Sequence, residues 1–167
     1  MKPTSHWTDV AAVVHIVDDE TEVRCLLEKV VRRAAYQAIT YASAGEFLQS
    51  YKPYDRECLI LDLRMPGQTG LDLLRTLAGR SHDVPVLCLS GSVSIAEAVA
   101  LVKLGAVDVL EKPWDQTLLL HRISVAIQIC GEVRSTRGQW RRRLERLTER
   151  ERQVMALLVR GEKTETI

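Results

Sequence analysis

The sequence predicts an α/β fold: a five-stranded, doubly wound parallel sheet with helices on both faces, followed by a helical linker and a partial helical domain. Short apolar runs without polar alternation, such as residues 58–61, are typical of strands buried on both faces of a parallel sheet. These runs alternate with helical patterns five times, at spacings that suit right-handed βαβ crossovers. A composition of 46% hydrophobic but only 5% aromatic residues is typical of an aliphatic core rather than a disordered chain.

The predicted strands are the five apolar runs, residues 12–17, 37–42, 58–61, 84–89 and 107–110. The first run leads directly into Asp18 and Asp19. The third stops at a single carboxylate, Asp62, after which Pro66 and Gly67 force the chain to turn. His15, in the middle of the first strand, is interpreted as a packed core histidine rather than a catalyst.

A helix is predicted after each strand, at residues 22–31, 43–51, 71–79, 95–104 and 115–130. Ser43 and Glu46 have capping-box spacing at the start of the second helix. Gly79 and Gly105 close the third and fourth helices, because glycine is a common residue just past a helix end. Asp115 is the expected cap of the fifth helix.

Charge and glycine placement predict four segments: an N-terminal arm (1–11), the α/β domain (12–130), a basic helical linker (131–146) and the start of another helical domain (147–167). Residues 1–130 carry 13 basic and 16 acidic side chains, whereas residues 131–152 carry eight Arg against four Glu. Gly131 and Gly138 are expected to interrupt the helical pattern after Cys130. The linker arginines indicate a solvated face or, alternatively, a weak nucleic-acid contact; they are Arg141, Arg142, Arg143 and Arg146.

The cysteines and the apolar runs indicate the compartment. Cys25, Cys58, Cys88 and Cys130 are far apart and form no C-x-x-C pair or His/Cys cluster, which favours reduced thiols over a zinc site. The N-terminus lacks the apolar core of a signal peptide, and no apolar run is long enough to cross a bilayer. We therefore expect a soluble, cytoplasmic protein with no membrane partner.

Polar side chains follow four of the five predicted strands, where the carboxyl ends of the strands form one edge of the sheet: Asp18 and Asp19, Asp62, Ser90, and Lys112. Asp18 or Asp19 alone could be a helix N-cap, and Asp62 alone a loop residue. Three carboxylates, a hydroxyl and an ammonium together predict a site for a metal and a phosphoryl group. Hard oxygen ligands favour Mg²⁺, and an ionised Asp can act as a nucleophile without a base.

With these motifs, residues 12–130 resemble the receiver domain of two-component response regulators, which has a flavodoxin-like fold. The resemblance implies that Asp62 is the phosphoacceptor and that a sensor histidine kinase is the donor. It also implies that Mg²⁺, or Mn²⁺ in its place, is held by Asp18, Asp19, Asp62 and the backbone carbonyl of Arg64. The matching stretches are Val17-Asp18-Asp19-Glu20, Asp62-Leu63-Arg64-Met65-Pro66-Gly67 with Gly70, Leu89-Ser90-Gly91 and Glu111-Lys112-Pro113.

The resemblance further implies that Ser90 is the switch hydroxyl, that Lys112 pairs with the phosphate, and that the Lys112-Pro113 bond is cis. One position departs from the family: Val109 stands where receivers commonly carry an aromatic residue that reorients on phosphorylation. A valine cannot make that movement, so the switch is expected to depend on Ser90 and the loop after it. Phosphorylation is expected to favour a homodimer through the face formed by residues 95–104, 107–110 and 115–130.

Residues 147–167 resemble the opening of the LuxR-type helix-turn-helix domain of NarL/FixJ regulators. Thr148 and Glu151 have capping-box spacing, and Gly161 is the expected terminator of the helix that they open. Thr164 and Glu165 stand where that family usually has an Asn-Lys pair, and the recognition helix does not follow. The chain is therefore expected to be a piece of a longer regulator that binds DNA through its full-length C-terminal domain.

Two alternatives remain beside this transcription-regulator hypothesis. A phosphatase with an aspartyl nucleophile usually places a second acid two residues after the first, and Arg64 occupies that position, which argues against it. A protein-interaction module that works without phosphorylation is left open by Val109.

Overall fold

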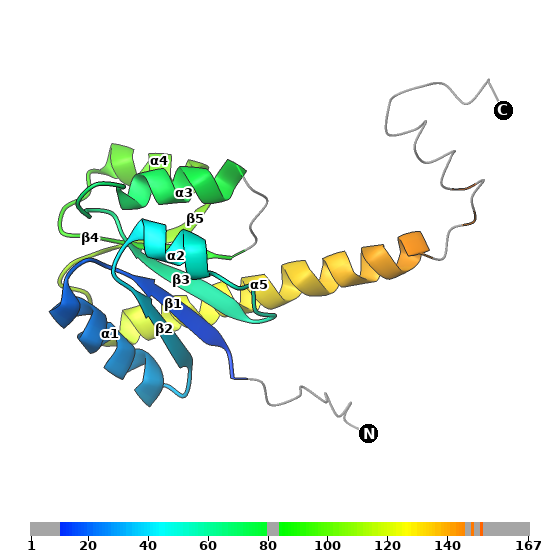
Figure 1. Cartoon of the computed structure of the whole chain (residues 1–167), viewed down its shortest axis with the longest axis horizontal. Helices are drawn as coiled ribbons and strands as arrows, with labels where there is room; N and C mark the ends of the chain where they lie inside the picture. Colours follow the sequence, from blue (N-terminus) through cyan, green and yellow to red (C-terminus); the bar gives the residue numbers. More distant parts are fainter. Residues whose placement is uncertain (1–10, 80–83, 146–147, 149–150, 152–167) are drawn as a thin grey trace. The chain divides into compact units, whose positions relative to one another are not determined.

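The computed structural model describes residues 11–79 and 84–145, together with Thr148 and Glu151; for residues 140–144 it describes the backbone only. Five strands form one sheet in the order β2-β1-β3-β4-β5, and every neighbouring pair is parallel (Figure 1). This confirms the predicted doubly wound α/β fold. The strands are β1 (Val13–Val17), β2 (Gln37–Tyr41), β3 (Glu57–Asp62), β4 (Val86–Ser90) and β5 (Ala106–Glu111).

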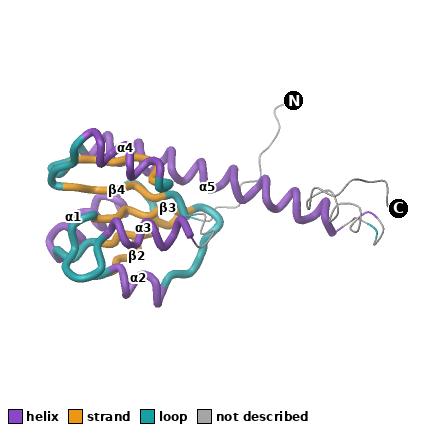
Figure 2. Tube along the Cα trace, turned by 90° about the horizontal axis from the view of Figure 1, so that it is seen from above, coloured by secondary structure: helices purple, strands orange, loops and turns teal. Residues whose placement is uncertain are grey.

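Helices cover both faces of the sheet (Figure 2). Because successive strand residues point to opposite faces, β1 sends Val14 and Ile16 to one face and Val17 to the other. The first face packs against α1 and the first half of α5, and the second against α2, α3 and α4. The helices are α1 (Thr21–Arg33), α2 (Ala44–Ser50), α3 (Gly70–Gly79), α4 (Ile95–Lys103) and α5 (Gln116–Glu145).

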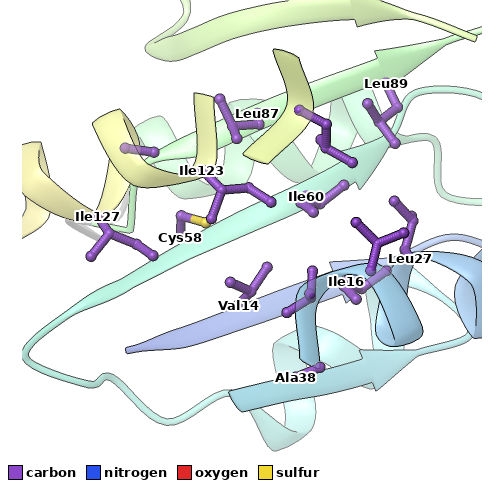
Figure 3. Close-up of a cluster of buried hydrophobic side chains, with 14 of the residues drawn as sticks. Val14, Ile16, Leu27, Ala38, Cys58, Ile60, Leu87, Leu89, Ile123 and Ile127 are labelled. Atoms are coloured by element: carbon purple, nitrogen blue, oxygen red, sulfur yellow. The ribbon is translucent and has the colours of Figure 1, made fainter. Parts of the chain in front are cut away.

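The core under α1 and α5 is aliphatic, as the composition predicts. Figure 3 shows Leu27 of α1 and Ile123 of α5 packed over Ile16 and Ile60 of the central strands. All four side chains have no exposed surface. Central strands β1 and β3 are buried along their whole length, which explains why they appear in the sequence as continuous apolar runs.

The expected caps are formed. The Ser43 hydroxyl accepts the amide of Glu46 at 3.1 Å, and the Asp115 carboxylate accepts the amide of Leu118 at 2.8 Å. Gly105 adopts φ of 101° directly after the C-cap residue of α4, a conformation that glycine reaches without strain. Local sequence signals therefore set most helix ends within one or two residues.

One expectation about the helices was wrong: Gly131 and Gly138 do not interrupt the helix, because α5 continues through both to Glu145. A glycine inside a helix costs only about 1 kcal/mol relative to alanine, and the surrounding Arg, Gln and Glu residues are good helix formers.

The chain divides between Gly131 and Glu132 into two compact units. No helix in the described ranges is both long and apolar enough to span a bilayer.

Most of the predicted segment 147–167, including Gly161, Thr164 and Glu165, lies outside the described residues. Thr148 and Glu151 are described and make the expected capping box: the Thr148 amide and hydroxyl donate to Glu151 at 2.7 and 2.8 Å. The linker arginines lie at the end of α5 or just beyond it, but their side chains, and all of Arg146, are outside the described part of the chain.

Candidate functional site

The carboxyl ends of β1 and β3 bring three acidic side chains together. Val17 pairs with Leu61, so Asp18 and Asp62 follow at the same level on adjacent strands. Ligand atoms of Asp18, Asp19 and Asp62 all lie within 4.8 Å of one another, and we call these three residues the acidic cluster. Across the described ranges, it is the one group of three potential metal ligands. Carboxylate oxygens at such separations fit a hard divalent cation.

Lys112 reaches the acidic cluster from the end of β5. Its Nζ lies 2.8 Å from Asp18 Oδ2 and 2.9 Å from Asp62 Oδ1, so a single ammonium bridges the two buried carboxylates. The Lys112 amide also donates to the Ser90 carbonyl at 2.7 Å, which ties the residue to the end of β4. The Lys112-Pro113 peptide bond is cis.

Burial and charge act in opposite directions on this site. Desolvation is the main cause that raises the pKa of the Asp62 carboxyl above its ordinary value, and the charge of Asp18 adds to it. Hydrogen bonding and attraction from Lys112 lower the pKa of Asp62 but do not outweigh burial. Burial alone would lower the pKa of Lys112, yet its hydrogen bonds to Asp18 and Asp62 raise it overall. The lysine therefore stays a cation, while the Asp62 carboxylate is less stable than it would be in water.

Neither acid of the Asp18-Asp19 pair is the N-cap of α1. The N-cap residue is Glu20, whose side chain makes no capping bond. Asp18 Oδ1 accepts the Glu20 amide at 2.9 Å, and its Oδ2 faces Lys112. The side chain of Asp18 is thus directed into the site, with the residue only 1% exposed.

The residues around the acidic cluster connect two loops. The Arg64 amide donates to Asp62 Oδ2 at 3.2 Å, while its guanidinium donates to the Ser92 carbonyl at 3.1 Å. The buried Ser90 hydroxyl donates to the same Ser92 carbonyl at 2.8 Å. Val109 is partly buried against the core under α2, α3 and α4, so it contributes packing at the position that carries an aromatic ring in many receivers.

Sequence analysis missed two contributions to this site. Arg24 Nη1 donates to the backbone carbonyl of Asp18 at 2.6 Å and so holds the loop between β1 and α1. No motif marks Arg24, which in the sequence is one of several charged residues on an amphipathic helix. The second contribution is the hydrogen bond of the Arg64 guanidinium to the Ser92 carbonyl, which the sequence did not predict.

Gly70, the first residue of α3, lies directly against the end of β3. A Cβ at this position would overlap the backbone carbonyl of Asp62 and crowd Leu63. The glycine in the motif therefore has a packing reason: it lets α3 begin directly against the end of β3.

Comparison with known proteins agrees with this geometry. The family model described as "Response regulator receiver domain" matches residues 14–124. The chain is 34% identical to the transcriptional regulatory protein FixJ of Azorhizobium caulinodans over 157 residues, covering 92% of this chain and 74% of that protein. It is 35% identical to the response regulator protein TodT of Pseudomonas putida over 159 residues, covering 93% and 70%.

Solved structures give the same result. The response regulator StyR superposes with a TM-score of 0.75 at 33% identity, covering 92% of this chain and 79% of that chain. Full-length FixJ from B. japonicum superposes with a TM-score of 0.67 at 30% identity, covering 91% and 76%. The chain therefore belongs to the response regulator receiver family of two-component systems, and it is homologous to the FixJ and TodT regulators.

Proposed function

We propose that this chain accepts a phosphoryl group on Asp62 from the phosphohistidine of a sensor histidine kinase and thereby controls transcription. The observation that carries the proposal is the pairing of Asp62, which is only 3% exposed, with Lys112 at 2.9 Å inside the acidic cluster. A nucleophile, a cation for the phosphoryl group and oxygen ligands for a metal thus share one edge of the sheet.

The transfer needs no general base. A carboxylate oxygen of Asp62 attacks the phosphorus, the bond between phosphorus and the phosphohistidine nitrogen breaks, and the imidazole leaves with the electron pair and takes up a proton. The Lys112 ammonium, which pairs with the Asp62 carboxylate before the transfer, then pairs with a phosphoryl oxygen. The Arg64 amide, 3.2 Å from Asp62 Oδ2, holds the orientation of the attacking carboxylate.

The donor set fits Mg²⁺, and Mn²⁺ has the same oxygen preference. Asp18, Asp19 and Asp62, with the backbone carbonyl of Arg64, would hold the ion. Bound there, it would supply positive charge to the phosphoryl oxygens during transfer. The acidic cluster carries three carboxylates against one nearby ammonium, so the ligands themselves favour a divalent cation.

The response to phosphorylation is proposed to be a homodimer. Ile95, Val99 and Val102 lie along α4 with 87%, 48% and 53% of their surfaces exposed, and Leu118 at the start of α5 is 41% exposed. Exposed aliphatic residues at helical spacing form an apolar stripe, which suits an interface between two copies. Ser90 at the end of β4 connects the phosphorylation site to the loop that leads into α4.

Control of transcription rests on the relatives. The chain matches most of the length of proteins named transcriptional regulatory protein FixJ, and we propose that its C-terminal segment begins a DNA-binding domain. The linker arginines would make at most phosphate contacts, which carry no sequence information. The phosphatase alternative gains no support, because the position two residues after Asp62 carries Arg64, bonded to Ser92.

Intact-mass measurement after incubation with acetyl phosphate and Mg²⁺ tests the proposal. The parent chain should gain the mass of one phosphoryl group, and removal of the metal with EDTA should prevent it. Asp62→Asn should gain nothing, because the amide is not a nucleophile. Asp55→Asn is the matched control: Asp55 is exposed, precedes the opposite end of the same strand, and should leave phosphorylation unchanged. A phosphoryl mass on Asp62→Asn would refute the assignment.

A further inference from the structure

The loop between β4 and α4, residues 91–94, is held from two directions at one backbone atom. The carbonyl oxygen of Ser92 accepts the Ser90 hydroxyl at 2.8 Å and the Arg64 guanidinium at 3.1 Å. A carbonyl oxygen has two lone pairs, so this acceptor is fully used. One donor is the proposed switch hydroxyl, and the other comes from the loop that carries the phosphoacceptor.

We propose that the Arg64 guanidinium is a latch that holds the β4–α4 loop in its unphosphorylated position. This inference rests on the proposed function, because it assigns a regulatory role to a residue two positions after the phosphoacceptor. Arg64 acts through Ser92 and touches no reacting atom with its side chain. It is therefore a positioning residue.

The geometry explains why the latch would open on phosphorylation. The Ser92 amide donates to Ser90 Oγ at 3.4 Å, so Ser90 and Ser92 are bonded in both directions. When the Ser90 hydroxyl turns toward a phosphoryl oxygen on Asp62, it no longer donates to the Ser92 carbonyl. The Ser92 amide, which donates to Ser90 Oγ, follows the hydroxyl. The bond between Ser92 and Arg64 is then lost. An interaction made in only one of two states favours that state.

The latch also reaches α4. Ser94 and Glu97 form the capping box of that helix, with the Glu97 amide 3.2 Å from Ser94 Oγ. Hydrogen bonds from Ser94 are the main cause that lowers the pKa of the Glu97 carboxyl, and the positive charge of Arg64 adds a smaller contribution. The guanidinium is thus bonded to the Ser92 carbonyl, two residues before Ser94, the N-cap of α4, and its release would change the loop that leads into that helix.

Val109 leaves the β4–α4 loop as the main connection between Ser90 and α4. An aromatic ring at that position can change its orientation when the switch hydroxyl moves. A valine is small and, being β-branched, is stiff at χ1, so it cannot transmit the movement in this way. With Val109 partly buried in the core, the route from Ser90 to α4 runs through Ser92. The exposed stripe of α4 then follows a loop whose Ser92 carbonyl is bonded to Arg64.

Hydrogen exchange of the full chain tests the proposal, with backbone amides of residues 91–101 as the readout. In the unphosphorylated protein, Arg64→Met removes the donors and keeps most of the side-chain length. Exchange in this segment should become faster by about fivefold, as expected for the loss of one hydrogen bond of typical net strength. Arg64→Lys keeps a cationic donor and should restore most of the protection.

Arg75→Met is the matched control. Arg75 is an exposed arginine on α3 that pairs with Asp72 at 3.5 Å, so its loss removes the same charge without touching the loop. Exchange in residues 91–101 should stay at the parent rate. Equal acceleration by Arg64→Met and Arg75→Met, or no acceleration by Arg64→Met, would overturn the latch.

Repeating the measurement with beryllofluoride and Mg²⁺ as the phosphoryl mimic separates the latch from the proposed function. The mimic should accelerate exchange of the loop in the parent and have a smaller effect in Arg64→Met, because that variant has already lost the bond. If the mimic changes nothing in the parent while Arg64→Met still loosens the loop, the latch stands and the phosphorylation switch fails. An equal effect of the mimic in both proteins would overturn the latch as part of the switch.

Discussion

A buried polar network outside the acidic cluster makes the sharpest stability prediction. His15 Nε2 lies 3.0 Å from Glu57 Oε2, and neither side chain has any exposed surface. Tyr41 Oη lies 3.0 Å from His15 Nδ1, and Tyr51 Oη donates to Glu57 Oε1 at 2.9 Å. Burial raises the pKa of Tyr41 to about 12, so its phenol keeps its proton and can donate to Nδ1. The imidazole then donates its Nε2 proton to Glu57.

Removing one member of this network takes one hydrogen bond from each group that it contacts. Glu57→Leu deprives both the His15 imidazole and the Tyr51 hydroxyl of an acceptor, at about 1–3 kcal/mol for each group. His15→Leu leaves the Glu57 carboxylate with one donor fewer. We expect each single substitution to lower the free energy of unfolding by about 3–5 kcal/mol, as for other broken buried pairs. That is a large part of the stability of a typical domain, about 5–15 kcal/mol.

The double variant His15→Leu/Glu57→Leu should lose much less than the sum of the two single losses. It removes the imidazole and the carboxylate together, so only the hydroxyls of Tyr41 and Tyr51 lose partners. A double-mutant cycle should therefore give a coupling energy of about 2–3 kcal/mol between His15 and Glu57. Urea unfolding, followed by circular dichroism, measures all four proteins, and equal m-values show that the transitions are comparable.

A surface pair in the same chain is the matched control. Arg32 Nε lies 2.9 Å from Glu28 Oε1 on α1, but these side chains are 59% and 34% exposed. The same cycle on this pair should give about 0.3–0.5 kcal/mol and should shrink in 1 M salt, whereas the buried coupling should persist. Single substitutions at His15 and Glu57 that cost under 1 kcal/mol, or that add without coupling, would refute the reasoning.

Three further predictions concern the site and its switch. Gly70→Ala should lower the free energy of unfolding by about 1–3 kcal/mol, because the added Cβ overlaps the Asp62 carbonyl. Gly131→Ala, where the Cβ meets open space in α5, should raise it by about 0.5–1 kcal/mol, and urea unfolding of both variants tests this. Lys112→Met should raise the pKa of Asp62 further, because attraction from the ammonium is lost, and a carboxyl titration by NMR that shows no upward shift would contradict this. Val109→Tyr should make dimerisation respond more steeply to a phosphoryl mimic in sedimentation velocity, and identical responses of variant and parent would show that this position does not limit the switch.

Much of the fold and the site could be predicted because the chemistry stands at the ends of buried strands. A parallel sheet places all strand ends of one kind on one edge, so Asp18 and Asp62 were expected at the same edge, and the adjacency of β1 and β3 brings them together. The strands themselves were visible as apolar runs because helices cover both faces. For Asp18, Asp62 and Lys112, sequence order and topology together gave the correct neighbours.

The partners of single polar side chains could not be predicted in the same way. His15 and Glu57 are 42 positions apart, and their meeting depends on the register between β1 and β3. The contact of Arg64 with Ser92 spans 28 positions and depends on how two loops fold back. Neither contact has a periodic signal, because periodicity reports which face a residue occupies and not which atom it meets. The continuation of α5 through Gly131 was missed because a glycine changes helix stability by little.

The two polar clusters differ in how their charges are balanced. In the network of His15 and Glu57, the donors and acceptors named above satisfy one another within the core. The acidic cluster has three carboxylates and one ammonium within 3 Å of two of them, so protein groups alone leave negative charge in excess. Burial is the main cause that raises the pKa of Asp62, and the negative charge of Asp18 adds to it. A divalent cation would bring the sum of these charges to zero. Conversion of the Asp62 carboxylate to an acyl phosphate would add negative charge again, which Lys112 is placed to meet.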